Sequence, residues 1–238
     1  MSIKRRLRAA WRRWRLSPKL GRTDFGALRR TSPISPVFGF DRGLPIDRYY
    51  IEDFLASHAN DIAGRVLEIA DSTYTDRFGG ARVSKAEVLH VDANAPGATI
   101  VGDLAHLSHV PADSFDCIVL TQTLQFIYEL EPAIGHVHRV LRPGGVVLCT
   151  LPGISQISRY DMDRWGDFWR FTTCSARRLF ESAFEPGNVT VEARGNVLAS
   201  VAFLHGLAVS ELTESELDDR DDDYQLILTV RAIKETES

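Results

Sequence analysis

The sequence predicts an α/β fold with a doubly wound, mostly parallel sheet of seven strands, of the Rossmann-like type. Short apolar segments alternate with helix-like segments between residues 44 and 233. This alternation is typical of a parallel sheet covered by helices on both faces. A second observation is that several strand-like segments end in an acid or an amide. Ligands of such sheets bind at the carboxyl ends of the strands, so the pattern predicts a binding site there.

The apolar runs predict the elements in order. Strands are expected at 65–70, 86–92, 98–104, 115–122, 145–152, 188–195 and 224–233, and helices at 44–62, 133–142, 175–184 and 197–208. Pro45 and the acids that follow it suit the start of the first helix. The turn Pro143-Gly144-Gly145 is expected to end the second helix, and Ser175 to cap the third.

One connection is too short for a regular parallel crossover. Only residues 93–97 separate the second strand from the third, whereas a parallel crossover normally needs about a dozen residues. Either the two strands are shorter than the apolar runs suggest, or the connecting helix is reduced to an extended turn. The sequence leaves both possibilities open.

Charge divides the chain into two parts. Residues 1–30 hold 11 Lys and Arg against one acid, whereas the whole 238-residue chain has a net charge of −4. The body is therefore acidic, and its charge argues against a nucleic-acid binder. Three cysteines far apart in the sequence are too few for a disulfide framework or a zinc site, so we expect no metal.

The N-terminal segment 3–16 has arginines around an apolar stripe that includes two tryptophans. This pattern predicts a basic amphipathic helix. It suits peripheral contact with an anionic membrane, a helix docked on the acidic body, or a frayed tail. Residues 1–36 are then an arm with a linker, and 37–238 are the domain. The domain is expected to carry an irregular loop at 153–174 and a helical insertion at 196–219.

No apolar run reaches the roughly 18 residues that a membrane-spanning helix needs. The basic N-terminus is also not followed by the apolar core of a secretory signal. We therefore expect a cytoplasmic protein, which the arm would bring to the inner face of the membrane if it binds lipid.

Two blocks of the sequence, "DSFDCIVLTQTL" and "RVLRPGGVVLCT", carry a family resemblance. Together with "RVLEIAD", "VLHVDA" and "TIVGDL", they resemble the small-molecule branch of the class I S-adenosylmethionine-dependent methyltransferases over roughly residues 40–185. The flanking segments "FGFDRGLPIDRYYIEDFL" and "WGDFWRFTTCSARRLF" are similar to a bacterial subgroup associated with surface-glycan gene sets. The resemblance implies S-adenosylmethionine as the cofactor.

The resemblance also implies a set of cofactor-binding residues. Residues along the methionine and the sugar would be Glu68, Ala70, Asp71, Ser72 and Thr73. Asp92 would accept hydrogen bonds from the ribose hydroxyls, Asp103 and Leu104 would hold the adenine, and Gln122 would border the sulfonium. Arg42 and Tyr50 are candidates to close the pocket, although a packing role is an alternative for the tyrosine.

The first motif departs from the family pattern. The positions of its glycines are taken by Ala70, Ser72 and Tyr74, and a tyrosine is expected to hinder the close approach that glycine allows. The hydroxyls of Ser72, Thr73 and Thr75 are expected to replace backbone contacts. Arg77 would bind the methionine carboxylate, or else pair with a neighbouring aspartate. The turn is thus predicted to bind cofactor with hydroxyl groups in place of glycines.

The stretch 158–173 combines acids, arginines and aromatic residues with little periodicity. Such a loop at the rim of the sheet suits an acceptor site, although an irregular loop with packed tryptophans is the alternative. The candidate substrate-binding residues are Tyr160, Trp165, Trp169 and Arg170. The candidate catalytic residues, which would orient or deprotonate a hydroxyl, are Asp161, Asp163 and Asp167.

These observations predict an S-adenosylmethionine-dependent methyltransferase that O-methylates a saccharide or a similar polar small molecule in polysaccharide biosynthesis. The alternative is a methyltransferase-like protein that binds a partner of glycan assembly without catalysis. An NAD-dependent oxidoreductase is disfavoured because residues 70–75 lack the glycine-rich dinucleotide turn.

Overall fold

The computed structural model describes residues 18–236 of the chain. It divides the chain into two units, 1–33 and 34–238. In the first unit the described residues form one short 3-10 helix, Gly26–Leu28. The basic helix predicted over 3–16 lies outside the described residues.

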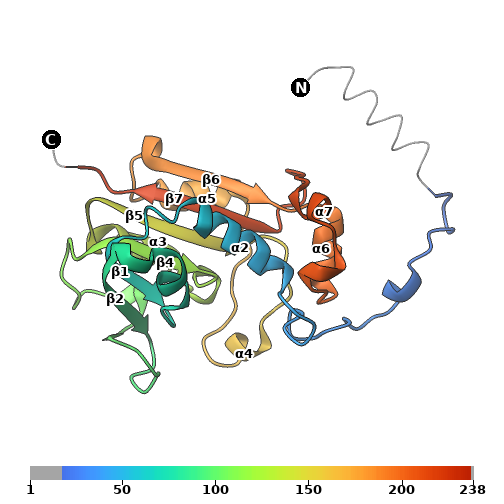
Figure 1. Cartoon of the computed structure of the whole chain (residues 1–238), viewed down its shortest axis with the longest axis horizontal. Helices are drawn as coiled ribbons and strands as arrows, with labels where there is room; N and C mark the ends of the chain where they lie inside the picture. The colour runs from blue at the N-terminus through green and yellow to red at the C-terminus, as the bar shows by residue number, and fades with distance from the viewer. Residues whose placement is uncertain (1–17, 237–238) are drawn as a thin grey trace. The chain divides into compact units, whose positions relative to one another are not determined.

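The second unit is built on the predicted seven-stranded sheet (Figure 1). The strands are β1 (Gly64–Ile69), β2 (Val83–His90), β3 (Ile100–Val101), β4 (Phe115–Thr121), β5 (Leu141–Pro152), β6 (Val189–Arg194) and β7 (Ile227–Ile233). Their order is β3-β2-β1-β4-β5-β7-β6. The pairs from β3 to β5 are parallel, whereas β7 runs antiparallel to both of its neighbours. The doubly wound, mostly parallel sheet predicted from the sequence is confirmed.

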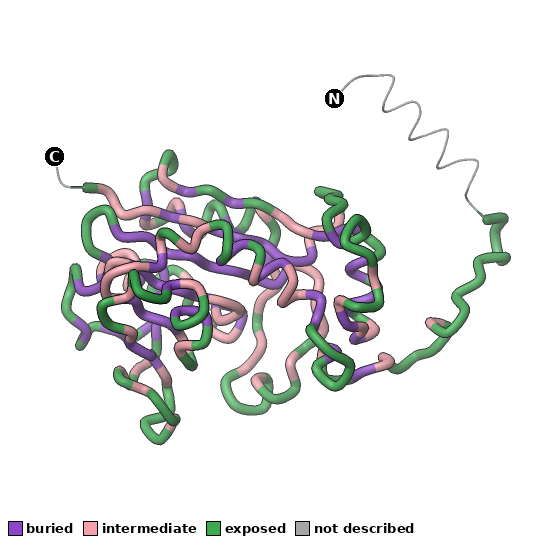
Figure 2. Tube along the Cα trace, in the orientation of Figure 1, coloured by how far each residue is buried: buried purple, intermediate pink, exposed green. Residues whose placement is uncertain are grey.

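Helices cover both faces of the sheet and bury a separate core on each. They are α2 (Ile46–Ser57), α3 (Leu130–Val140), α4 (Arg159–Met162), α5 (Thr173–Phe180), α6 (Val197–Leu204) and α7 (Glu214–Asp218). Alternation along the strands separates the two cores: Leu67 packs with α3 and α5, while Val66 packs with α2 and α6. Buried residues accordingly run along the central strands in Figure 2.

The short connection between the second and third strands is explained by a very short β3. Only Ile100 and Val101 pair, with Leu89 and His90 of β2, and residues 91–99 join the strands without a helix. β3 is thus shorter than predicted and β2 ends two residues earlier than predicted, and an extended turn also replaces the helix. β3 is an edge strand and pairs only with β2, so its length is limited by the residues of β2 that remain to pair with it.

Two predicted boundaries are wrong. The chain leaves α3 at Val140 and enters β5 at Leu141, which pairs with Phe115, so the Pro-Gly-Gly turn lies inside the strand. The ladder shifts register there, and Gly144 has a φ of +79°. Thr172, rather than Ser175, caps α5: its hydroxyl accepts the Ser175 amide, and the two residues form a capping box.

The insertion before the last strand contains α6 and α7, which Figure 1 shows together where β6 ends and β7 begins. Asn196 starts α6 by accepting the Ala199 amide, and its side-chain amide donates to the carbonyls of Glu216 and Asp219. Among the described residues no helix has the length and apolar character needed to cross a bilayer.

Candidate active site

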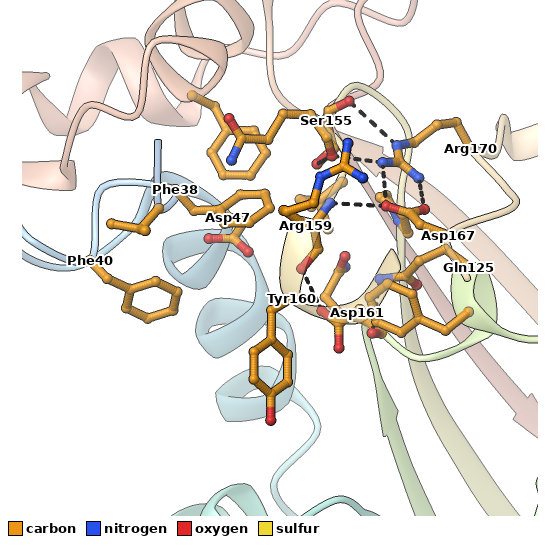
Figure 3. A pocket seen from close by; sticks show the side chains of 18 of the residues that line it. Phe38, Phe40, Asp47, Gln125, Ser155, Arg159, Tyr160, Asp161, Asp167 and Arg170 are labelled. Atoms are coloured by element: carbon orange, nitrogen blue, oxygen red, sulfur yellow. Dashed lines mark hydrogen bonds and ion pairs between the residues drawn. The ribbon is translucent and has the colours of Figure 1, made fainter. Parts of the chain in front are cut away.

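A cavity of about 370 Å³ lies at the carboxyl ends of β4 and β5. Its walls come from the segment before and into α2, from the turn after β4, from the loop after β5 and from α6. The lining residues are Pro36, Val37, Phe38, Phe40, Asp47, Arg48, Gln122, Gln125, Phe126, Pro152, Ser155, Gln156, Ser158, Arg159, Tyr160, Asp161, Asp167, Arg170, Phe203 and Ile227. Figure 3 shows Phe38, Phe40 and Asp47 on one side and Gln125, Asp167 and Arg170 on the other.

A buried serine shapes the wall formed by residues 35–41. The Ser35 hydroxyl donates to the Asp41 carboxylate and accepts the amides of Val37 and Gly39. Gly39 approaches the 206–207 backbone so closely that a Cβ at this position would lie 2.9 Å from the Leu207 carbonyl oxygen. This contact needs glycine, and it holds the wall against the end of α6.

The loop after β5 is organised by an ion pair. The carboxylate of Asp167, 1% exposed, accepts two hydrogen bonds from the Arg170 guanidinium, at 2.5 and 3.0 Å, and one from the Ser158 amide. Arg170 also donates to the carbonyl of Gln156 at 2.6 Å. Both residues line the cavity as predicted, but their polar groups bind the loop itself. This corrects the expectation that Asp167 moves a proton and that Arg170 binds substrate.

The short helix α4 places its residues differently. Tyr160 and Asp161, predicted as a substrate-binding and a catalytic residue, line the cavity. The Asp161 carboxylate accepts a hydrogen bond from the Ser158 hydroxyl. Asp163 is exposed and pairs with Arg159 at 3.2 Å, outside the cavity, so the structure does not support its predicted catalytic role.

Asp47 and Gln125 are among the cavity residues that were missed from the sequence. Asp47, in the first turn of α2, is half-buried, and burial raises the pKa of its carboxyl although Arg48 opposes the shift. Gln125 is 5% exposed; its amide nitrogen donates to the Gln122 carbonyl at 2.8 Å, and its Oε1 is buried without a partner. Asp47 resembled an ordinary helix-start acid, and nothing in the sequence singled out Gln125.

The turn after β1 keeps the backbone of a glycine turn at its first position. Ala70 has a φ of +76° and is exposed. Such a conformation is costly for a residue with a Cβ. Asp71 is exposed and accepts the Thr73 amide at 2.8 Å, while the Ser72 hydroxyl donates to Asp76.

The tyrosine in this turn does not obstruct it. Tyr74 is 7% exposed and its ring packs in the core beneath α2. Its hydroxyl accepts a hydrogen bond from Arg48 at 2.7 Å. The expected hindrance is therefore wrong, because the ring points inward. The predicted hydroxyl contacts are also reduced: Thr75 is buried and Ser72 is bonded to Asp76, which leaves Thr73 exposed.

Glu68 fixes the far side of the same turn. Its buried carboxylate accepts the amides of Tyr74 at 3.1 Å and Thr75 at 2.7 Å. Burial raises the pKa of Glu68 to about 6, although the hydrogen bonds oppose the shift. Glu68 therefore holds the conformation of the turn.

Exposed carboxylates follow the next two strands. Asp92 lies just past β2 and accepts the Asn94 amide at 2.9 Å. Asp103 lies just past β3 and caps the 3-10 helix Leu104–His106 by accepting the Ala105 amide. Leu104 is buried beside it. The predicted cofactor residues of β1, β2 and β3 thus lie along one edge of the sheet.

Backbone strain gathers at this edge. Of the four described non-glycine residues with positive φ, Phe38 (+60°) and Gln122 (+47°) line the cavity and Ala70 (+76°) forms the turn after β1. Strained residues of this kind concentrate at functional sites. Gln122 follows β4 directly, so it stands between the edge that holds Ala70 and the cavity.

Residues 56–149 match the family described as "Methyltransferase domain". This part of the chain is therefore similar to a methyltransferase domain, and it includes β1 to β4 and most of β5. No curated protein matches the sequence.

Solved structures share the fold of this chain. A possible histamine N-methyltransferase from Thermotoga maritima has a TM-score of 0.54 at 16% identity, with 82% of this chain and 95% of that chain covered. An S-adenosylmethionine-dependent methyltransferase from Archaeoglobus fulgidus gives 0.53 at 10% identity, covering 79% and 94%. Phosphoethanolamine N-methyltransferase 2 from Haemonchus contortus, in complex with S-adenosylmethionine, gives 0.52 at 14%, covering 84% and 60%.

S-adenosylmethionine, the cofactor expected from the sequence, is consistent with the match to a methyltransferase domain and with the groups at the strand ends. The exposed turn at Ala70 leaves backbone accessible to a ligand, and the carboxylates of Asp92 and Asp103 are free to accept further hydrogen bonds. Neither the domain nor its fold gives support to the alternative of a non-catalytic partner.

Three predicted cofactor residues have their polar groups bound elsewhere in the protein. Arg42 pairs with Glu211, and Arg77 pairs with Glu52 rather than with a neighbouring aspartate. The Tyr50 hydroxyl donates to the Leu217 carbonyl within the core. These contacts occupy the polar groups that were expected at the cofactor.

The two tryptophans of the loop after β5 also lie outside the cavity. Trp165 is exposed and stands edge-on to His90 at the end of β2, on the predicted cofactor side. The Trp169 indole donates to the Ile127 carbonyl at 3.0 Å and stacks on Tyr128. Trp169 therefore packs within the protein, which is the alternative that was expected for this loop. Trp165 lies instead beside the carboxyl end of β2.

Proposed function

We propose that the protein uses S-adenosylmethionine to methylate a hydroxyl group of a saccharide or a similar polar small molecule. Methyl transfer in general rests on the methyltransferase domain and its fold. The acceptor class rests on the cavity, which lies beside the expected cofactor edge and combines aromatic rings with carboxylates and amides. Aromatic walls with a few polar groups are typical of small-molecule sites.

On the cofactor side we assign the residues along the carboxyl edge of β1–β4. Asp92 would accept the ribose hydroxyls, while Asp103 and Leu104 would hold the adenine. The turn at Ala70 would lie against the methionine part. Gln122 would border the sulfonium, since it lines the cavity and directly follows β4. The bound cofactor would supply an activated methyl group, so alignment of the acceptor contributes much of the acceleration.

On the acceptor side, the size of the cavity is in the range of small-molecule sites. Phe38, Phe40 and Tyr160 offer rings against which the apolar face of a pyranose can pack. The polar groups between them offer hydrogen bonds to hydroxyls. A role in polysaccharide biosynthesis would follow from such an acceptor.

We further propose that residues 3–16 bring the protein to the inner face of the cytoplasmic membrane. The support is their sequence pattern of arginines around an apolar, tryptophan-containing stripe. Deletion of residues 1–20 should abolish sedimentation with anionic vesicles at low salt. If the full chain does not sediment with them, the membrane contact is refuted.

Calorimetric titration with S-adenosylhomocysteine tests the cofactor assignment first. We expect micromolar affinity, and incubation with tritiated S-adenosylmethionine and a panel of glycosides should then label one of them. No binding at millimolar S-adenosylhomocysteine would refute the proposed function.

A further inference from the structure

The cavity contains three guanidinium groups, and each has a partner within the protein. Arg170 is paired with Asp167, and Arg159 with Asp163. The Arg48 guanidinium donates to the Tyr74 hydroxyl and lies over the Tyr74 and Phe40 rings. A cavity whose cations are engaged in this way is poorly suited to a phosphate or carboxylate group, because the strongest hydrogen bonds to an anion come from charged donors.

Two of the polar groups left to a ligand are hydrogen-bond acceptors. Gln125 Oε1 is buried and has no hydrogen-bond partner among residues 18–236, and the residue is 5% exposed. An unpaired buried carbonyl of this kind carries a desolvation cost that a ligand donor would remove. The Asp47 carboxylate lines the same cavity, and its one hydrogen bond among the described residues comes from the Arg48 amide to Oδ1, at 2.9 Å. Both groups call for a ligand that presents donors.

Among the three aspartates of the cavity, Asp47 is the least committed. Asp167 is saturated by Arg170 and the Ser158 amide, and Asp161 holds the Ser158 hydroxyl at the start of α4. Asp47 has no ion pair with any described residue. Figure 3 shows its side chain at the cavity between Phe38 and Tyr160.

Building on the proposed function, we propose that Asp47 binds the reacting hydroxyl of an uncharged, polyhydroxylated acceptor and takes its proton, while Gln125 Oε1 accepts a second hydroxyl. In this step the oxygen forms a bond to the methyl carbon as the carbon–sulfur bond of S-adenosylmethionine breaks. The sulfur keeps the electron pair and leaves as neutral S-adenosylhomocysteine. The hydroxyl proton moves to the Asp47 carboxylate, which balances charge and atoms. Burial, which raises the pKa of Asp47, favours the protonated product of the transfer.

Binding of simple sugars tests this assignment without turnover. Saturation-transfer NMR with the methyl α-pyranosides of glucose, mannose, galactose and rhamnose should detect binding to the wild-type protein, with or without S-adenosylhomocysteine. Asp47→Asn keeps an oxygen for the Arg48 amide but removes the charge, and should weaken binding about tenfold or more. Labelled methyl transfer to the bound pyranoside should fall by about 10²–10⁴-fold, the usual contribution of a general base.

Two further variants make the outcome specific. Asp53→Asn is the matched control, because Asp53 is exposed on the same helix and faces Arg194 away from the cavity. It should bind and transfer as the wild type does. Gln125→Met removes the buried acceptor at similar volume and should weaken pyranoside binding several-fold, which tests the subsite independently of Asp47.

Charged probes define what would overturn the proposal. Glucose 6-phosphate should bind more weakly than the neutral pyranosides. If only glucosamine binds, the site takes an amine and the hydroxyl assignment is wrong. If no pyranoside binds, or if Asp47→Asn matches Asp53→Asn, the role of Asp47 is refuted even when S-adenosylhomocysteine binds. If S-adenosylhomocysteine fails to bind while pyranosides do, the proposed function falls and the Asp47 sugar contact stands.

Discussion

Replacing Ala70 by glycine should stabilise the folded domain, although glycine usually weakens a fold. Ala70 holds a φ of +76° at the end of β1, and its side chain is exposed. A left-handed conformation costs a residue with a Cβ about 1–2 kcal/mol. Glycine avoids that cost but loses about 0.5–1 kcal/mol through the extra freedom of the unfolded chain. The difference leaves a gain of roughly 0.5–1 kcal/mol.

Urea unfolding followed by circular dichroism can resolve a gain of this size. With a slope of about 2 kcal/mol per molar urea, the midpoint should rise by roughly 0.4 M. Ala86→Gly is the matched control, because Ala86 lies inside β2 with an ordinary φ. It should lower the free energy of unfolding by about 0.5–1 kcal/mol. The two glycine substitutions should therefore change the free energy of unfolding in opposite directions. It should rise for Ala70, in the turn after β1, and fall for Ala86, inside β2.

A third variant tests whether a larger side chain at position 70 lowers the free energy of unfolding. Ala70→Val places a β-branched residue in the left-handed region, where its cost exceeds that of alanine, so the order of stability should be Gly, then Ala, then Val. If Ala70→Gly is destabilised as much as Ala86→Gly, the turn stores no strain at this position. The reading of Ala70 as the first glycine position of the cofactor turn would then lose its physical basis.

Other changes test the remaining parts of the site. Asp92→Ala should leave the fold intact and weaken S-adenosylhomocysteine binding by about 1.5–3 kcal/mol, the worth of hydrogen bonds to a charged group; unchanged affinity in calorimetry would remove Asp92 from the site. Asp167→Asn should lower the free energy of unfolding by about 3 kcal/mol, since it leaves the Arg170 guanidinium without its partner; a loss below 1 kcal/mol would show that the pair does not hold the loop. Glu68 has a folded pKa of about 6 against an ordinary 4.5, so its contribution is full below pH 4.5 and is lost as the pH rises through 6, by roughly 2 kcal/mol. Glu68→Gln should flatten the melting temperature between pH 4.5 and 6.5, and an unchanged slope would contradict the assignment.

The sheet was predictable because its strands are apolar runs of the right length. The edge of the sheet was less predictable. The run 98–104 predicted a full strand, but only Ile100 and Val101 pair. Pairing depends on the neighbour, which ends at His90, and not on the apolar character of the run. In the same way, the ladder with Phe115 draws Leu141 into β5 before the Pro-Gly-Gly turn.

The cofactor edge was predictable for a different reason. The carboxyl ends of parallel strands meet at one edge, so Asp92 and Asp103 are brought together by chain order alone. The acceptor cavity depends instead on long-range contacts. Residues 34–39 reach it because the Ile34 and Ser35 amides donate to the His205 carbonyl. No local pattern encodes that approach, so Phe38 and Asp47 could not be placed from the sequence.

Tyr74 shows how the turn can lose glycines without losing its shape. Of the three glycine positions, only Ala70 has a positive φ; Tyr74 has a φ of −79° and suits any residue. Its ring can fill the core because Glu68 binds the amides of Tyr74 and Thr75 and so fixes the backbone. The tyrosine hydroxyl then holds Arg48, the neighbour of Asp47 in α2. The residue that replaces a glycine therefore joins the expected cofactor turn to the helix that carries the acceptor-binding carboxylate, a connection that a glycine could not make.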